Sequence, residues 1–436
     1  MPKRTPFPPV FWVANIVEVL ERFAYYGIYF GFGIYMTHLG HSTERLGTIQ
    51  SLFLLLSYSV PLISGTLADR YGFKKMLIVS YLAYLPAVLL LLVATDYYPL
   101  LFTMLCIGFA AGIFKPLVAS TVRVTSDNTN KTLGFGIYYA MVNIGGSFGP
   151  VISGYLRGDS SWRSAHIAGA VAIGVMFLIT LFFYKEPPRE VSTETVGDRL
   201  RGIVTVLADA KFATFLVLLG VFFWLPFWAF FNLCALYVDA NVDTVALYGS
   251  LSHGLSWIPG LGPWLVSILS HEENGVRKVL GESISHTGYI IMILQLPISW
   301  IFERFRAIPS FIFGLGVAGI GLAVLGLAAT GSASFVFLGI LLFATGEMIT
   351  SPRVQEYITW IAPKEKAGLY TGSNFLAVMI GAFLSGFVYT TGLYGYFSAT
   401  GHPQYVWYVM GVHMAVAMLA FWLFVKLAGE FREQEQ

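Results

Sequence analysis

Charged residues are scarce in this sequence: lysine, arginine, aspartate and glutamate together make up 11% of its 436 residues. A soluble chain carries about a quarter charged residues, because its surface must be solvated. The shortage therefore excludes a water-soluble enzyme, a nucleic-acid-binding protein and a disordered scaffold. Hydrophobic residues reach 56%, which leaves a helical protein that crosses the lipid bilayer many times.

Cysteine is almost absent, and both cysteines, Cys106 and Cys234, lie in apolar runs, so no disulfide framework is expected. The net charge of +2 leaves no excess of positive charge for nucleic acid. The sequence has no phosphate-binding loop, no metal-ligand spacing and no nucleophile triad. We therefore expect no cofactor, no metal and no catalytic residue, and we expect that the protein is not an enzyme.

Twelve apolar runs are long enough to cross the hydrocarbon layer, which takes about 20 residues each. The predicted spans are 10–38, 47–68, 76–94, 98–122, 132–156, 164–184, 212–238, 284–303, 308–329, 333–358, 367–392 and 404–427. The longest polar stretch separates six spans from six. We predict an all-α membrane protein with two pseudo-symmetric six-helix bundles, 1–184 and 212–436, joined by a cytoplasmic linker, 185–211, that holds a short amphipathic helix. This is the layout of major-facilitator transporters.

The distribution of basic residues predicts the orientation in the membrane. With the N-terminus inside, 18 basic residues fall in inner segments, 5 in outer segments and 3 within spans, which accounts for all 26. This bias follows the positive-inside rule and predicts cytoplasmic N- and C-termini. A thirteenth span at 246–270 would reverse the bias in the second half, and that run contains many glycines and prolines. We therefore expect 239–283 to form a long outer excursion of short helices.

The loop between the second and third spans reads Gly65-Thr-Leu-Ala-Asp69-Arg70-Tyr-Gly72-Phe-Lys74-Lys75. It resembles the major-facilitator loop signature and lies on the predicted cytoplasmic side. Asp69 can accept hydrogen bonds from a helix N-terminus or an arginine. Such a contact holds the two halves together in one state and releases them in another, so Asp69 and Arg70 are predicted gating residues.

Several charges lie inside predicted spans, where each costs roughly 2.5–3.5 kcal/mol on insertion scales. One face of the first span carries Glu18, Arg22, Tyr25 and Tyr29, with Glu21 and Tyr26 on its flanks. Two carboxylates beside one arginine cannot both be well neutralised, and Lys115 of the fourth span lies at a similar depth. Groups that take up protons and face a cavity are what a proton-coupled carrier requires.

The tenth span holds Glu347 near its middle, and Arg353 and Glu356 nearer the cytoplasm. The spacing of Arg353 and Glu356 predicts an ion pair, either structural or part of an inner gate.

Five elements carry a family resemblance. Glu18-Val-Leu-Glu21-Arg22-Phe23-Ala-Tyr25-Tyr26 is similar to the ExxERFxYY motif of the proton-dependent oligopeptide transporter family. Further similar elements follow in order: Phe114-Lys115-Pro116, Tyr138-Tyr139-Ala-Met-Val-Asn143-Ile-Gly145, Gly346-Glu347 with Ser351-Pro352, and Ala362-Pro363 to Gly386.

The resemblance implies roles for these residues. Glu18, Glu21, Lys115 and Glu347 would couple transport to protons. Arg22 and Lys115 would face a substrate carboxylate, and Glu347 an amino group. Tyr25, Tyr26 and Asn143 would line the cavity. Tyr29 and Asn374 would stand in the substrate site where family members often have an arginine and an aromatic residue.

The resemblance implies a proton-coupled symporter of di- or tripeptides or related amphoteric compounds, working by alternating access as a functional monomer in a prokaryotic plasma membrane. Its partners would be a small-molecule substrate, protons and the lipid bilayer. The seventh span departs from the family because it has no acidic residue. Two alternatives therefore stay open: an exporter of a non-peptide anionic or amphipathic solute in exchange for protons, and a non-transporting sensor that uses the outer segment.

Two weaker signals complete the sequence. Six of the eight histidines, His286 among them, fall in predicted outer segments, where we expect solvated side chains. The aromatic run 222–231 is expected to pack against neighbouring helices and lipid.

Overall fold

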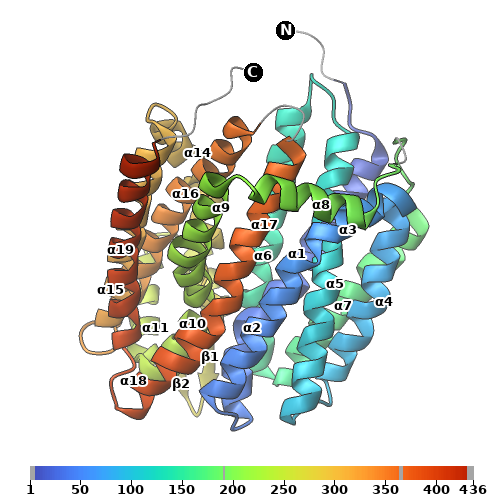
Figure 1. Cartoon of the computed structure of the whole chain (residues 1–436). Coiled ribbons are helices and arrows are strands. Elements are labelled where there is room, and N and C mark those ends of the chain that lie inside the picture. Colours follow the sequence, from blue (N-terminus) through green and yellow to red (C-terminus); the bar gives the residue numbers. More distant parts are fainter. Residues whose placement is uncertain (1–4, 190–191, 363–366, 430–436) are drawn as a thin grey trace.

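The computed structural model is a bundle of long helices with one small β-hairpin (Figure 1). It describes residues 5–189, 192–362 and 367–429. The N-terminal half consists of α1 (Pro9–His38), α2 (Thr43–Ser59), α3 (Pro61–Tyr71), α4 (Phe73–Leu91), α5 (Tyr97–Val124), α6 (Lys131–Asp159) and α7 (Trp162–Phe183). The linker contains α8 (Val196–Leu207).

The C-terminal half has more interruptions. It consists of α9 (Ala210–Leu218), the π-helix η1 (Leu219–Trp224), α10 (Leu225–Asn241), α11 (Thr244–Leu255), α12 (Leu261–Leu269), β1 (Ser270–Glu273), β2 (Val276–Val279), α13 (Gly281–Ile284), α14 (Gly288–Phe302), α15 (Ala307–Leu327), α16 (Phe335–Ile361), α17 (Ala367–Ser385), the π-helix η3 (Gly386–Tyr394), α18 (Gly395–Ala399) and α19 (Tyr405–Ala428). Each of the twelve predicted spans coincides with one of these helices or with a run of consecutive ones.

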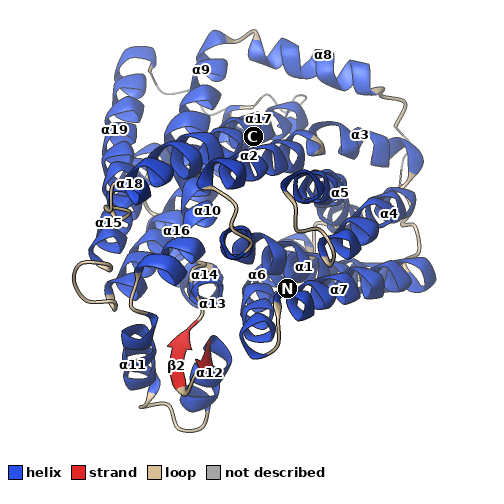
Figure 2. Cartoon of the chain, turned by 90° about the horizontal axis from the view of Figure 1, so that it is seen from below, coloured by secondary structure: helices blue, strands red, loops and turns tan. Residues whose placement is uncertain are grey.

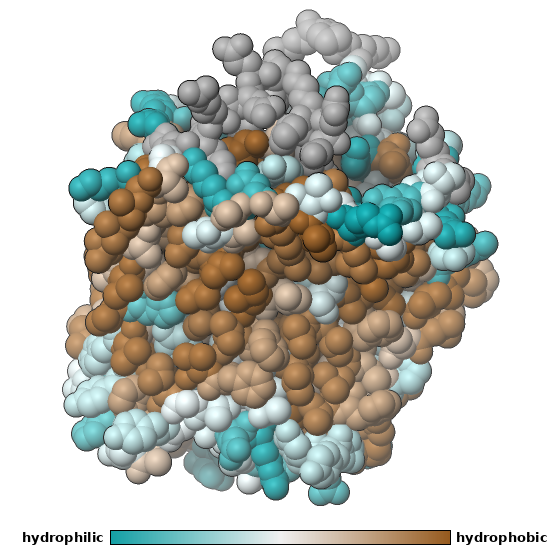
Figure 3. All heavy atoms as spheres, viewed as in Figure 1, coloured by the Kyte–Doolittle hydropathy of each residue, from teal (hydrophilic) through white to brown (hydrophobic). Residues whose placement is uncertain are grey.

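Ten helical segments in the described part of the chain are long and apolar enough to cross a membrane. The other two predicted spans, α1 and α6, are 30 and 29 residues long. The middle of α1 carries Glu18, Glu21 and Arg22, while α6 is rich in glycine, and this makes both helices more polar than the other ten. On the face seen in Figure 3, a broad apolar band lies between hydrophilic residues at the two ends, as a bilayer requires.

Helices α1 and α6 approach each other closely because α6 has glycines where the two cross. A Cβ added at Gly145 would overlap the carbonyl oxygen of Val19, and one added at Gly149 would overlap that of Phe23. Small residues of this kind allow two helix backbones to touch inside a membrane. The crossing holds the charged middle of α1 against the glycine face of α6, since a Cβ at Gly145 would also meet the Cβ of Arg22.

The substitution Gly149→Ala tests this crossing. We expect it to destabilise the protein by about 1–3 kcal/mol, because the new methyl group meets backbone that cannot move away. Gly136→Ala on the same helix is the matched control, since no atom lies within 4 Å of a Cβ added there. Thermal unfolding of the purified protein should show a lower midpoint for Gly149→Ala alone, and equal midpoints for the two variants would contradict the packing argument.

The linker helix α8 lies across one end of the bundle, the end at which α1 begins and α19 finishes (Figure 1). The predicted amphipathic helix, 198–210, corresponds to α8, which begins two residues earlier. Thr195 and Asp198 fix its start, since each side chain accepts a hydrogen bond from the backbone N–H of the other. Leu200 and Val204 on its outward face are exposed, as expected for a helix at the membrane surface.

We had expected the outer excursion, 239–283, to consist of short helices alone, but it also contains a β-hairpin. Helices α11 and α12 are followed by the antiparallel pair β1 and β2, in which Ser270 pairs with Val279 and Glu273 with Val276. Asn274 and Gly275 form the turn, and both have positive φ angles, 53° and 79°. Asn-Gly is the residue pair that two-residue hairpin turns favour. The hairpin lies at the opposite end of the bundle from α8 (Figures 1 and 2).

Candidate functional site

The charged face of α1 forms a compact buried cluster. Arg22 Nε donates to Glu18 Oε1 at 2.8 Å and lies 3.0 Å from Glu21 Oε2. Both glutamates are 0% exposed and Arg22 is 5% exposed. Because Glu18 precedes Arg22 by four residues, one helical turn is enough to bring the two together. The sequence-predicted cluster is thus present as a close ion-paired group.

The hydrogen bonding of this cluster is incomplete. Within the described part of the chain, Glu18 Oε2 and both carboxylate oxygens of Glu21 accept no hydrogen bond, although Glu21 Oε2 is ion-paired with Arg22 Nε at 3.0 Å. One guanidinium therefore serves two carboxylates, and the group as a whole carries one uncompensated negative charge when both are ionised. Burial without donors is costly for a charged group and favours its neutral form. This arrangement can accept a proton or a second cation.

Lys115 is the nearest candidate for a second cation, yet in this structure it has a different partner. Its Nζ donates to Ser57 Oγ at 2.5 Å, and the same hydroxyl lies 3.1 Å from the Tyr25 hydroxyl. The ammonium also lies over the rings of Tyr25 and Tyr58, 4.4 Å and 4.8 Å from their centroids. Among the described residues, Lys115 forms no ion pair with the cluster on α1. The hydroxyl of Ser57 thus lies between the Lys115 ammonium and the Tyr25 hydroxyl on α1.

A central cavity with about 550 Å³ of empty space lies between the two halves. Its lining comes from α1, α6, α10, α14, α16 and the segment before α14: Tyr26, Phe30, Val142, Asn143, Gly146, Phe227, Trp228, Phe231, His286, Thr287, Gly288, Ile291 and Glu347. Three predicted substrate-site residues, Tyr26, Asn143 and Glu347, meet here from three helices. Glu347 Oε2 has no hydrogen-bond donor in the described structure.

Two groups of cavity residues were missed by the sequence analysis. The aromatic run was expected to face neighbouring helices and lipid, but Phe227, Trp228 and Phe231 line the cavity. His286 was expected to be solvated on the outer side, but it is 2% exposed and lines the same cavity. The aromatic residues are spaced at i, i+1 and i+4, which places them on one helix face, and this signal was available in the sequence. Hydropathy gave no signal for His286.

Tyr29 and Asn374 lie outside the cavity. The Tyr29 hydroxyl donates to Asn232 Oδ1 on α10, and Asn232 Nδ2 donates to Ser385 Oγ at 2.8 Å. Gln50 Nε2 donates to the backbone oxygen of Asn232 at 3.0 Å. This buried network ties α1 and α2 to α10 and α17, so it joins the two halves. Asn374 is buried on α17 and does not line the cavity.

The loop motif around Asp69 contacts the linker. The carboxylate of Glu186 accepts hydrogen bonds from the backbone N–H groups of Phe73, at 2.7 Å, and Lys74, at 2.8 Å, and so caps the start of α4. Arg189 bonds Glu186 at 3.1 Å and donates to the backbone oxygen of Asp69. The neighbouring guanidinium of Arg70 lies 5.6 Å from the ring centroid of Tyr71.

The inner part of α16 has an ion pair of its own. Arg353 Nη1 lies 2.6 Å from Glu356 Oε2, which is the pair that their spacing predicts. Arg353 also donates to the backbone oxygen of Phe302 at the end of α14.

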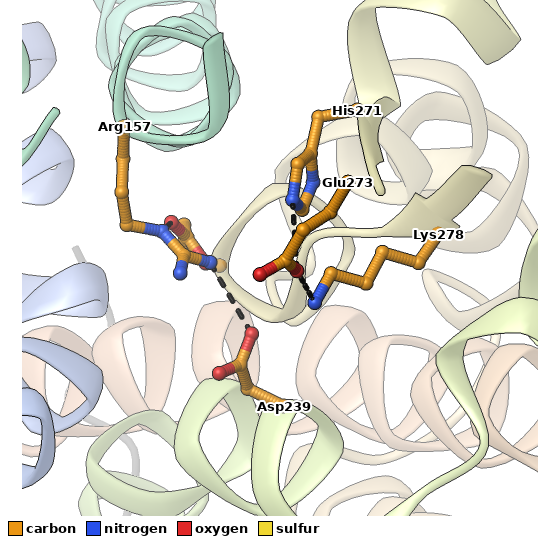
Figure 4. A network of polar contacts seen from close by, with 6 residues as sticks. Arg157, Asp239, His271, Glu273 and Lys278 are labelled. Carbon is orange, nitrogen blue, oxygen red and sulfur yellow. Dashed lines mark hydrogen bonds and ion pairs between the residues drawn. The ribbon is translucent and has the colours of Figure 1, made fainter. Parts of the chain in front are cut away.

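An ion-paired cluster joins the two halves at the end of the bundle that carries the hairpin, which is the predicted outer end (Figure 4). Arg157 on α6 binds both carboxylate oxygens of Glu282, at 2.6 Å and 2.8 Å, and Asp239 Oδ1 at 3.2 Å. Arg157 belongs to one half, and Asp239 and Glu282 belong to the other. The hairpin adds His271 and Lys278, which both approach Glu273. Burial lowers the pKa of His271, and the positive charges of Lys278 and Arg157 act in the same direction.

A family model described as Major Facilitator Superfamily matches residues 14–386. Among curated proteins, the quinolone resistance protein NorA of Staphylococcus aureus is 24% identical over 160 residues, which cover 37% of this chain and 41% of NorA. The match thus spans about two fifths of NorA's length. The uncharacterized MFS-type transporter YqjV of Bacillus subtilis is 22% identical over 415 residues, covering 94% of this chain and 92% of YqjV.

Solved structures resemble the chain over nearly its whole length. A mutant of the nucleoside transporter NupG has a TM-score of 0.74 at 13% identity, with 95% of this chain and 99% of NupG covered. A proton-dependent oligopeptide transporter has a TM-score of 0.73 at 20% identity, with 97% and 99% covered. A POT family transporter in complex with 5-aminolevulinic acid has a TM-score of 0.69 at 19% identity, with 95% of each chain covered. These likenesses show the all-helical fold of the family. The chain therefore belongs to the major facilitator superfamily and is a secondary transporter embedded in a membrane, not an enzyme.

Proposed function

We propose that the protein transports a small solute that carries an amino group, and that it couples this transport to protons by alternating access. The observation that supports proton coupling is the buried cluster on α1, where three of the four carboxylate oxygens of Glu18 and Glu21 have no hydrogen-bond donor among the described residues. A proton on either glutamate removes the uncompensated charge beside Arg22. We assign the coupling role to Glu18 and Glu21, and propose that Lys115 leaves Ser57 for this cluster during the cycle.

The substrate site of this proposal is the central cavity. Glu347 is the one acidic residue among the described residues that line it, and its free oxygen is placed to accept a hydrogen bond from an ammonium group. Tyr26 and Asn143 supply further polar contacts from the other half. Binding between residues of both halves lets the solute influence how the halves pack, as alternating access requires.

The substitution Glu21→Gln tests the coupling assignment. Purified protein in proteoliposomes is driven by an inwardly directed pH jump with radiolabelled dialanine as the probe. Wild type should accumulate the probe, whereas Glu21→Gln should lose accumulation by at least about tenfold because the side chain no longer takes up a proton. Exchange of external for internal dialanine should persist, since it needs no net proton movement.

Glu44→Gln is the matched control, because Glu44 is exposed at the outer start of α2. It should accumulate dialanine as wild type does. Accumulation by Glu21→Gln against the dialanine gradient after the pH jump would show that Glu21 is not the coupling group.

A second candidate function is export of a cationic amphipathic solute in exchange for protons. None of the described residues that line the cavity is a lysine or an arginine, and five of them are Phe, Tyr or Trp. Arg22 is already engaged by two carboxylates, and neither Arg22 nor Lys115 lines the cavity, so a peptide carboxylate bound there would have no cationic partner among the described lining residues in this conformation. The partial similarity to NorA, a protein named for quinolone resistance, points the same way.

Ethidium separates the two candidates. Inside-out vesicles energised by respiration should take up ethidium if the protein is an exporter, while dialanine uptake driven by a pH jump supports the symporter. Because the chain belongs to a transporter family, we no longer retain the alternative of a non-transporting sensor.

We further propose that the protein lies in a bacterial plasma membrane with its termini in the cytoplasm. We also propose that it functions as a monomer, because one chain supplies both walls of the cavity.

A further inference from the structure

We propose that His286 contacts the transported solute directly and donates a hydrogen bond from its Nε2–H to an acceptor atom of that solute. Together with Glu347, it would select solutes in which an amino group and a hydrogen-bond acceptor, such as a carbonyl oxygen, lie a few bonds apart. The inference rests on the proposed function of the central cavity as the substrate site and assigns the chemistry that the site recognises.

His286 lies in the short segment between α13 and α14, at the edge of the central cavity. Its side chain is 2% exposed, and its neighbours Thr287 and Gly288 line the same cavity. A buried histidine is normally hydrogen-bonded through both ring nitrogens. His286 Nε2, however, has no hydrogen-bond partner among the described residues. It is therefore an unpartnered polar atom on a side chain that lines the cavity.

The other ring nitrogen determines which tautomer is present. The backbone N–H of Gly288 donates to His286 Nδ1 at 3.3 Å. A nitrogen that accepts a hydrogen bond carries no proton, so the neutral ring has its proton on Nε2. The group offered to the cavity is thus an N–H donor. An acceptor on the solute would satisfy a donor that is otherwise buried without a partner.

Aromatic contacts fix the direction of this donor. The imidazole stacks on Phe30 with ring centroids 6.0 Å apart and an angle of 6° between the planes, and it contacts the Tyr289 ring at 4.2 Å. Phe30 belongs to α1 and His286 to the C-terminal half, so the ring packs against the other half of the protein. Next to it, Gly288 lies so close to Ser147 of α6 that a Cβ would overlap the Ser147 hydroxyl. A donor on a ring packed against two aromatic neighbours is pre-oriented for one acceptor position.

The charged residues around the cavity further restrict the class of solute that it can bind. Glu347 calls for a cationic group, and the described lining residues include no lysine or arginine to bind a separate anion. His286, as a neutral donor, suits the carbonyl oxygen of an amide, ester or ketone. The favoured class is therefore an aromatic or aliphatic amine that carries a nearby carbonyl, which includes the N-terminal unit of a peptide.

Two probes that differ by one carboxamide group test the inference. L-Phenylalaninamide and 2-phenethylamine share a phenyl ring and an amine, but only the first has a carbonyl. Binding to the purified full-length protein is measured by isothermal titration calorimetry at about pH 6, where both amines are protonated. Wild type should bind the amide about fivefold to tenfold more tightly, the range of one net hydrogen bond.

Two substitutions separate the donor from the ring. His286→Phe keeps an aromatic ring for stacking on Phe30 but has no N–H, and it should bind both probes equally, at the affinity of 2-phenethylamine. His286→Gln keeps a side-chain N–H donor of similar reach and should retain part of the preference. An amide preference that persists in His286→Phe overturns the inference. Equal binding of the two probes by wild type overturns it without any variant, so the test does not depend on how His286→Phe folds.

Glu347→Gln distinguishes failure of this inference from failure of the proposed function. If the cavity binds amines, this substitution weakens both probes about equally. Weakening of both probes by Glu347→Gln, combined with an unchanged amide preference in His286→Phe, would reject the role of His286 and leave the amine site intact. If Glu347→Gln bound both probes as tightly as wild type does, or if wild type bound neither probe, the amine site would be rejected and the inference with it.

Discussion

Replacing Arg22 with alanine is expected to destabilise the folded protein by about 3–5 kcal/mol, because it leaves two buried carboxylates without their shared cation. Glu18 and Glu21 are both 0% exposed, and three of their four oxygens already lack hydrogen-bond donors in the described structure. Lys115 cannot compensate fully, since it would have to give up its hydrogen bond to Ser57. Thermal unfolding in detergent should show a much lower midpoint, and dialanine uptake should be lost.

The matched control removes the whole cluster at once. In the triple variant Glu18→Gln, Glu21→Gln and Arg22→Met, no charge remains to be left unpaired, so the melting temperature should return close to that of wild type. Uptake driven by a pH jump should still be absent, because the two glutamates to which we assign the coupling role can no longer take up a proton. If Arg22→Ala had the same melting temperature as wild type, the two carboxylates would have to be neutral or solvated. The cluster would then not carry the uncompensated negative charge that we describe.

The positions of the spans could be predicted because lipid imposes one rule along the whole chain. A residue in the hydrocarbon layer must be apolar or must have a partner, so every run of about 20 apolar residues marks a helix. The cluster on α1 was predictable for the same reason, since charges inside a span stand out against the apolar background. Spacing within a single helix then brought Glu18 and Arg22 together.

The partners of these residues could not be predicted, because they depend on how different helices pack. Lys115 was expected beside the glutamates, at a similar depth, but depth does not determine which way a side chain points, and the structure places it on Ser57. His286 was misplaced because one polar residue near the end of a span has the same hydropathy whether it faces water or a cavity. Asn374 is buried on α17 and does not line the cavity, although its position in the sequence resembles that of a substrate residue.

The π-helical segments η1 and η3 were also beyond the sequence, because a π-turn costs little and has no fixed residue signature. The structure shows what stabilises them. His413 on α19 joins both, with Nε2 at 3.0 Å from the Val221 carbonyl oxygen in η1 and Nδ1 at 2.6 Å from the Tyr389 hydroxyl in η3. Its place as a satisfied residue inside the bundle agrees with the ordinary expectation for a histidine in a span.

Replacing Arg157 with alanine is expected to open the outer end of the protein. In the closed state, Glu282 is 1% exposed and depends on the bidentate contact with Arg157. Without the guanidinium, that carboxylate would be buried unpaired at a cost of about 3–5 kcal/mol, a cost that vanishes once the halves separate and water reaches it. The balance between closed and open states should therefore shift toward open on the order of 10²–10³-fold.

Spin labels report this shift directly. One label replaces Ser160, an exposed residue at the end of α6, and the other replaces exposed Val276 in the hairpin, in a background without Cys106 and Cys234. The distance distribution of wild type should show one short distance between the two labels. In Arg157→Ala, a longer distance should appear beside the short one or replace it.

The controls for this experiment separate the gate from general damage. Arg163→Ala removes an exposed arginine at the same end and should leave the distances unchanged. The double variant Arg157→Gln and Glu282→Gln removes both charges, so the closed state no longer contains an unpaired carboxylate and the short distance should return. If Arg157→Ala kept the wild-type distances, closure of the outer end would rest on the polar network around Asn232 and the glycine contacts of α6, and the ion pair would be a consequence of closure, not its cause.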